Sequence, residues 1–167
     1  LGYGNAAQED AMHLVSRSLA LPLTTAVVMV VALSSLGLSQ AGGGRRHINL
    51  PGKSPALPFS DGVLVGDTLY LAGRIGIDPA TGLPPQDVEK EVRIILDGIK
   101  ATVEAAGMTM NDLVNVTVFC PDISLYDGFN DVYRTYFDEN FPARAFVGSG
   151  PLLRGVRFEV KGIAVKR

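Results

Sequence analysis

The chain has 167 residues, of which 47% are hydrophobic and 19% are charged. This apolar content suffices for a packed core and excludes disorder for most of the chain, and a single cysteine, Cys120, excludes an internal disulfide framework. The 15 basic and 17 acidic side chains give a net charge of −2, so the chain has no overall positive field that would gather nucleic acid.

Residues 1–41 carry the pattern of a targeting segment. Between Arg17 and Arg45 the sequence has no ionisable side chain, and an apolar run followed by small residues extends from Leu19 to Ala41. This layout is typical of a signal peptide, and it predicts cleavage after Ala41 and a periplasmic or secreted protein. Two alternatives stay open: an uncleaved membrane anchor, or a start assigned too far upstream on a cytoplasmic protein.

Residues 42–55 predict a flexible linker, because they open with three glycines, which pack little and are costly to order. The folded domain is then expected over residues 56–167, and both histidines, His13 and His47, lie outside it. A folded part without histidine excludes Ser-His-Asp and Cys-His catalytic arrangements. No group of Cys, His and carboxylate residues has the spacing of a zinc site, so we expect no metal.

The folded part opens with strand and turn signals. Two short β-rich runs on either side of Gly66 and Asp67 predict a hairpin over residues 62–73. Residues 78–85 combine several prolines with a glycine and predict a surface loop.

A helix and a strand are expected next. Apolar residues recur every three or four positions from Asp87 to Gly107 with charged residues between them, which predicts an amphipathic helix of about five turns. The β-branched run Leu113–Cys120 predicts a strand that is buried on at least one face.

A second helix and two strands complete the pattern. Ser124 is expected to cap the helix, with Asp127 favourably placed in its first turn, and Pro142 prevents its continuation. Residues 143–147 and 156–165 predict two further strands. Strands mixed with two helices predict an α+β domain, in which both helices pack on one face of the sheet.

Two charged side chains stand where charge is costly. Arg144 lies at the entry of an apolar strand, and its guanidinium can hold a carboxylate through two parallel hydrogen bonds. Glu159 lies between Phe158 and Val160 and can hold or polarise a water molecule. The alternatives are structural: Arg144 as a solvated edge residue or half of an ion pair, and Glu159 as one residue of a solvent-exposed strand face.

Seven short motifs, taken together in their order and spacing, carry a resemblance to a known family. They are Val65–Gly73, Asp78–Gly82, Glu104–Gly107, Val116–Phe119, Asn130–Tyr133, Phe141–Arg144 and Gly162–Val165. On these motifs the chain from about Leu57 to Val165 resembles the reactive intermediate deaminase A family, also called YjgF or endoribonuclease L-PSP-like.

The resemblance implies a chorismate-mutase-like α+β fold that assembles as a homotrimer, with active sites in the clefts between subunits. Active family members hydrolyse reactive enamines and imines, of the 2-aminoacrylate and 2-iminobutanoate type, to 2-keto acids and ammonia. They require no metal or organic cofactor. The expected partners are therefore a small imine or 2-keto acid and further copies of the chain, without nucleic acid.

The resemblance also implies roles for individual residues. Arg144 matches the arginine that holds the substrate carboxylate, and Glu159 matches the glutamate near the attacking water. Gly73 matches a glycine whose backbone approaches the ligand, Asn130 matches an orienting residue in the second helix, and Phe146 occupies a position whose backbone contacts the substrate.

Three cleft positions depart from the family pattern. Phe59 and Ala72 stand where the bacterial deaminases have a tyrosine and a serine, so two hydrogen-bonding hydroxyls are missing. Arg74 replaces a frequent glutamine, and it is expected either to pair with Asp61 or Glu159 or to bind a second anion. The missing hydroxyls keep one other function open, a non-catalytic trimeric binder of small carboxylates. A third function, RNA cleavage or translation inhibition, is attached to some family members and has less support here, because the expected domain has no histidine and no basic stripe.

Overall fold

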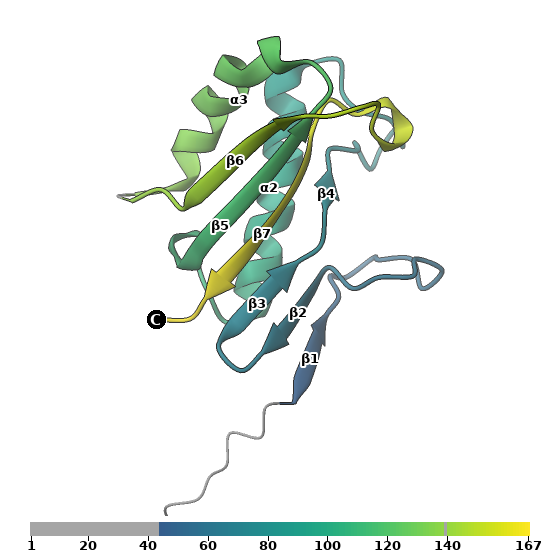
Figure 1. Cartoon of the computed structure of the whole chain (residues 1–167). Helices are drawn as coiled ribbons and strands as arrows, with labels where there is room; N and C mark the ends of the chain where they lie inside the picture. The colour runs from purple at the N-terminus through teal and green to yellow at the C-terminus, as the bar shows by residue number, and fades with distance from the viewer. Residues whose placement is uncertain (1–43, 139) are drawn as a thin grey trace, which may run out of the picture. The chain divides into compact units, whose positions relative to one another are not determined.

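The computed structural model describes residues 44–138 and 140–167 of the chain (Figure 1). The elements, in chain order, are β1 (Arg45–Ile48), β2 (Gly62–Val65), β3 (Thr68–Leu71), β4 (Arg74–Ile75), α2 (Val88–Ala105), η1 (Met110–Asp112), β5 (Leu113–Cys120), η2 (Ile123–Leu125), α3 (Tyr126–Tyr133), η3 (Arg134–Tyr136), β6 (Ala143–Gly148), η4 (Leu153–Gly155) and β7 (Glu159–Val165). The α+β class is therefore confirmed.

The strands form one mixed sheet. Their order is β1-β2-β3-β7-β5-β6, with β4 also paired to β7. All neighbouring pairs are antiparallel except β5 and β6, which run parallel and are connected through α3, as a parallel pair requires. Figure 1 shows α2 and α3 on the same face of this sheet, as predicted.

Helix α2 forms where the apolar periodicity predicts it. Its N-cap is Asp87, whose side chain accepts a hydrogen bond from the backbone N–H of Glu89 at 2.9 Å. Its buried apolar face, Val92, Ile95, Leu96, Ile99 and Val103, covers the sheet. Gly107 follows the helix with a φ of +79°, a conformation that glycine adopts without strain and that ends many helices.

Strand β5 lies between β7 and β6 and has one face in the core. Val116, Val118 and Cys120 are buried, whereas Thr117 and Phe119, which point to the other face, are only half-buried. The bounds Leu113–Cys120 are the predicted ones. The face of the sheet that the helices leave uncovered is thus only partly shielded from solvent within one chain.

The predicted linker over residues 42–55 is wrong for Arg45–Ile48, which form strand β1 and pair with β2. Only Ile48 of this strand is buried, at 4% exposure. Two arginines and a histidine gave no strand signal, and the free edge of β2 supplies the pairing partner. His47 therefore belongs to the folded part, where its Nδ1 lies 3.0 Å from Oγ of Ser60, so the expected absence of histidine is also wrong.

Two smaller details differ from the predictions. Ser124 lies inside η2 and does not cap α3; instead Asp122 accepts a hydrogen bond from the Ser124 backbone N–H at 3.0 Å. Asp127 does lie in the first turn of α3. Strand β7 begins at Glu159, three residues later than predicted, because η4 and an extended segment precede it.

The predicted leader over residues 1–41 lies outside the described residues, so export stays a prediction. Among the helices of the described residues, none combines the length and the apolar character needed to cross a membrane.

Candidate functional site

Arg144 is held on the helix-covered face of the sheet, near the start of the edge strand β6. The parallel register places it beside Val116, which is buried in the core. Its Nη2 donates a hydrogen bond of 2.7 Å to Oδ1 of Asn130 on α3. Asn130 is only 7% exposed, so this bond fixes the guanidinium from a rigid element.

Aromatic rings surround the same guanidinium. The Cζ atom of Arg144 lies 4.7 Å from the ring centre of Tyr133 and 5.7, 5.9 and 6.0 Å from those of Tyr126, Phe129 and Phe146. These distances are those of cation–π contacts. The rings shield the arginine without offering it a counter-charge, which leaves its donors available to a bound anion.

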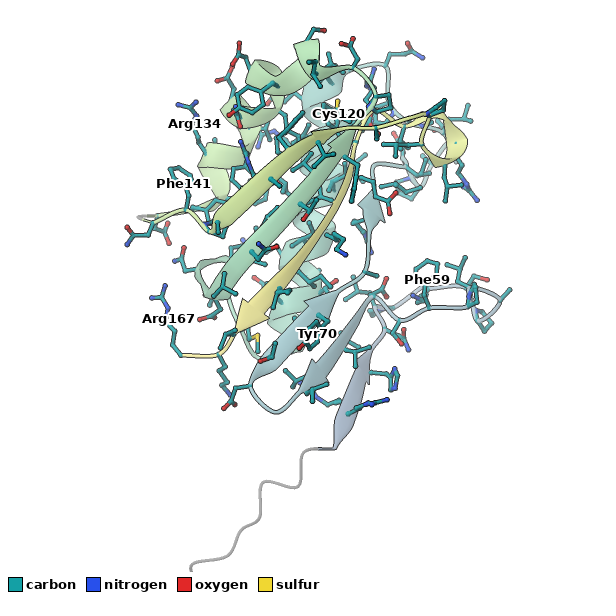
Figure 2. All side chains as sticks on the ribbon, in the orientation of Figure 1. Phe59, Tyr70, Cys120, Arg134, Phe141 and Arg167 are labelled. Atoms are coloured by element: carbon teal, nitrogen blue, oxygen red, sulfur yellow. The ribbon has the colours of Figure 1, made fainter. Side chains whose placement is uncertain are left out.

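A cleft of about 470 Å³ opens beside Arg144; its lining consists of Tyr126, Asn130, Tyr133, Arg134, Phe141 and Arg144. Figure 2 shows Arg134 and Phe141 on the outer side of α3 and β6. The Tyr133 hydroxyl is buried and has no hydrogen-bond partner within the described residues, and burial raises the pKa of Tyr133 to about 12. Tyr133 is therefore neutral at physiological pH and cannot balance the arginines.

Glu159 lies in a second group of residues, around β4 and the start of β7. It pairs with Ile75 in the β4–β7 ladder, next to Arg74. A Cβ atom at Gly73 would overlap the Glu159 carboxylate, so the close approach of this side chain to the backbone requires glycine at that position. The structure thus brings Gly73 and Glu159 together.

Arg74 is used in an ion pair with Asp61, one of the two predicted outcomes. Its Nη1 lies 3.4 Å from Oδ1 of Asp61, and Nζ of Lys53 lies 3.5 Å from the same oxygen. The other Asp61 oxygen accepts a hydrogen bond of 2.9 Å from the backbone N–H of Leu50. The backbone carbonyl of Asp61 accepts a hydrogen bond of 3.0 Å from the backbone N–H of Ala72.

Phe59 lies on the loop that Asp61 ties to β4. Its ring is 51% exposed, and Nζ of Lys53 lies 4.1 Å from the ring centre. Through Asp61, this loop is fixed next to Ala72, the other position that lacks a family hydroxyl. Figure 2 shows Phe59 well separated from Arg134 and Phe141, on the opposite side of the domain.

Arg144 and Glu159 do not meet within one chain. Register places Arg144 beside Val116, whose side chain faces the helices, and Glu159 beside Phe119, whose side chain points to the uncovered face. Paired residues point to the same face of a sheet, so the two charged groups lie on opposite faces. Phe146 and Asn130 belong with Arg144, whereas Gly73 and Glu159 form the other group.

Sequence reasoning missed four residues of the cleft: Tyr126, Tyr133, Arg134 and Phe141. Tyr126 precedes Asn130 by four positions, and Tyr133 and Arg134 follow it by three and four, the spacing that places side chains on one face of a helix. That spacing was the available signal. In the described residues, no group of three or more His, Cys, Asp or Glu side chains is arranged to hold a metal ion.

Comparisons with known proteins agree with this fold. A family model described as Endoribonuclease L-PSP matches residues 51–166. The 2-iminobutanoate/2-iminopropanoate deaminase of the goat Capra hircus is 40% identical over 124 residues, which cover 72% of this chain and 90% of that protein.

Solved structures give the same result. The YjgF gene product of Escherichia coli matches with a TM-score of 0.67 and 36% identity, over 73% of this chain and 99% of that one. Escherichia coli TdcF with bound serine matches with a TM-score of 0.63 and 33% identity, over 73% and 94% of the two chains. The chain therefore belongs to the endoribonuclease L-PSP family, which includes the YjgF and reactive intermediate deaminase A proteins that its motifs resemble.

Proposed function

We propose that this protein hydrolyses 2-imino acids and their enamine tautomers, of the 2-iminobutanoate and 2-aminoacrylate type, to 2-keto acids and ammonia. One observation carries the proposal: the guanidinium of Arg144, fixed by Asn130 and enclosed by aromatic rings, borders an open cleft and has no carboxylate partner among the described residues. The name of the goat relative and the serine bound to TdcF support a small amino-acid-like ligand.

In the proposed reaction, Arg144 binds the substrate carboxylate through its two parallel N–H groups. Glu159 accepts a proton from a water molecule while the water oxygen adds to the imine carbon, and Glu159 passes this proton to the imine nitrogen. The resulting amino alcohol then gives its hydroxyl proton to Glu159 as the carbonyl of the 2-keto acid forms and the C–N bond breaks. Glu159 passes this second proton to the departing nitrogen, which leaves as ammonia.

This reaction requires two copies of the chain, and we propose a homotrimer with sites between subunits. Arg144 and Glu159 lie on opposite faces of one sheet, so one copy cannot present both to one substrate. The uncovered sheet face also exposes apolar side chains, which assembly would bury: Tyr70, Val114, Val147 and Val165. Among the described strands, β6 lies at an edge of the sheet, where another copy can approach.

The experiment measures the hydrolysis of 2-iminobutanoate, generated in situ by an amino acid oxidase acting on 2-aminobutyrate. We expect the wild-type protein to exceed the spontaneous rate, and Arg144→Ala to lower kcat/KM by about 100-fold, because a carboxylate loses its charged partner. Arg45→Gln, which removes the same charge from the far edge of the sheet, is the matched control.

Three outcomes would contradict the proposal in different ways. A wild-type rate equal to the spontaneous rate excludes the activity. Saturable binding of 2-ketobutyrate without turnover favours a carboxylate binder, the function that Phe59 and Ala72 keep open. RNA cleavage that survives both Arg144→Ala and rigorous repurification favours a ribonuclease.

A further inference from the structure

The Arg144 cleft contains a second guanidinium, that of Arg134. Arg134 is the first residue of η3, directly after α3, and it follows Asn130 by four positions. Residues at this spacing have Cβ atoms about 6 Å apart on one helix face. Because Asn130 holds Arg144 directly, both arginines lie within reach of one small ligand.

The charges that the described residues bring to the cleft are unbalanced. Among these residues, the lining has two arginines, two tyrosines, an asparagine and a phenylalanine, but no acidic residue. Within residues 44–138 and 140–167, no carboxylate lies within 4.0 Å of the guanidinium nitrogens of either Arg134 or Arg144. Two like charges in one partly enclosed cleft repel each other, and a ligand with two negative charges would relieve that repulsion.

We propose that Arg134 binds a second carboxylate, so that the preferred substrates are imines of dicarboxylic 2-keto acids, such as 2-iminoglutarate. This inference rests on the proposed function, because it assigns the first carboxylate to Arg144. The methylene groups between the two carboxylates pack against the exposed rings of Tyr126 and Phe141, which are 44% and 57% exposed. A substrate with a short apolar side chain would leave Arg134 without a partner.

The chemistry at the imine carbon does not change in this assignment. Water adds to the carbon, the C–N bond breaks, ammonia leaves, and the distal carboxylate remains ionised throughout. Arg134 therefore determines substrate preference. Its charged hydrogen bond to the distal carboxylate lowers the free energy of the bound dicarboxylic substrate and not that of a bound substrate with an apolar side chain.

The test compares 2-iminoglutarate with 2-iminobutanoate, each generated in situ by an amino acid oxidase, in the wild-type protein, Arg134→Gln and the control Arg45→Gln. We expect the wild type to have a kcat/KM about tenfold higher for 2-iminoglutarate. Arg134→Gln should lower the 2-iminoglutarate value about ten times more than the 2-iminobutanoate value. Arg45 lies on β1, at the opposite edge of the sheet. We therefore expect Arg45→Gln to leave both kcat/KM values unchanged.

A binding measurement makes the inference independent of turnover. Calorimetric titration with 2-ketoglutarate and 2-ketobutyrate should give tighter binding of the dicarboxylate to the wild type and a loss of that preference in Arg134→Gln. If 2-iminobutanoate is hydrolysed but neither readout depends on Arg134, the inference is wrong and the proposed function stands. If neither imine is hydrolysed while the binding preference depends on Arg134, the proposed function fails and the dicarboxylate site stands.

Discussion

A guanidinium that is to recognise a carboxylate must present its N–H groups in one fixed orientation. Asn130 provides this by accepting a hydrogen bond from Arg144 through its amide oxygen. An amide satisfies one donor of Arg144 without neutralising its charge, whereas an aspartate at the same place would pair with it and compete with the substrate. The uncharged partner is therefore the feature that keeps the arginine available.

Tyr133 predicts a specific pH dependence of stability. Burial raises its pKa from the ordinary value of 10 to about 12, so the folded protein holds this proton more tightly than the unfolded chain. The resulting stabilisation is fully present below pH 10 and is lost as pH rises through 12. Two pKa units correspond to about 2 to 3 kcal/mol in the free energy of unfolding.

Tyr133→Phe removes both this proton and a buried hydroxyl that has no hydrogen-bond partner in the described part of the chain. Urea denaturation should show that the variant is no less stable than the wild type at pH 7, and that its free energy of unfolding falls less steeply between pH 10 and pH 12. Parallel curves for the two proteins over that interval would show that Tyr133 ionises equally easily in both states.

An ion pair between Glu91 and Arg157 joins helix α2 to the segment that directly precedes β7. Glu91, which is fully buried, accepts hydrogen bonds of 2.7 Å from both the backbone N–H and the Nε of Arg157, and one of 3.3 Å from the backbone N–H of Phe158. The guanidinium of Arg157 also donates to the carbonyl of Gln86 at 3.0 Å. These contacts fix the chain immediately before Glu159.

We expect Glu91→Ala and Arg157→Ala each to lower the free energy of unfolding by about 3 kcal/mol. Arg157→Ala leaves the fully buried Glu91 carboxylate without its counter-charge, and Glu91→Ala removes the acceptor of the Arg157 guanidinium and of two backbone N–H groups. The double variant should lose clearly less than the sum of the two, since the second substitution removes the charge that the first one stranded. Urea denaturation of all four proteins measures this; strictly additive losses would mean that the two side chains are not coupled.

The local sequence pattern predicted those elements whose formation depends mainly on the residues within them. The helix over α2 and the strand over β5 follow from apolar periodicity and β-branched content, because the faces they bury are continuous in the sequence. Strand β1 could not be predicted in this way, since Arg45–Ile48 buries only its last side chain. Its structure depends on the edge that β2 offers, and β2 is separated from it by the loop that carries Phe59.

The candidate site shows the same limit. Local placement singled out Arg144 and Glu159, and the resemblance gave them roles, but their placement on opposite faces depends on the strand order β7-β5-β6 and on the register of each pair. Neither the strand order nor the register can be read from a local sequence motif. The aromatic surround of Arg144 likewise combines residues of α3 with Phe146 of β6, which meet only after β6 pairs with β5.

If each site combines Arg144 of one copy with Glu159 of another, two strongly impaired variants should restore each other. Arg144→Ala retains an intact Glu159, and Glu159→Gln retains an intact Arg144, so assemblies that contain both variants include some sites with both native residues. Mixing the two after partial denaturation and refolding should recover a substantial fraction of wild-type 2-iminobutanoate hydrolysis, whereas each variant refolded alone should keep its own strongly reduced rate. Light scattering on the refolded mixture establishes whether the assembled species contains three copies. Mixed assemblies without recovered activity would mean that one copy supplies both residues, and the two-copy site would have to be abandoned.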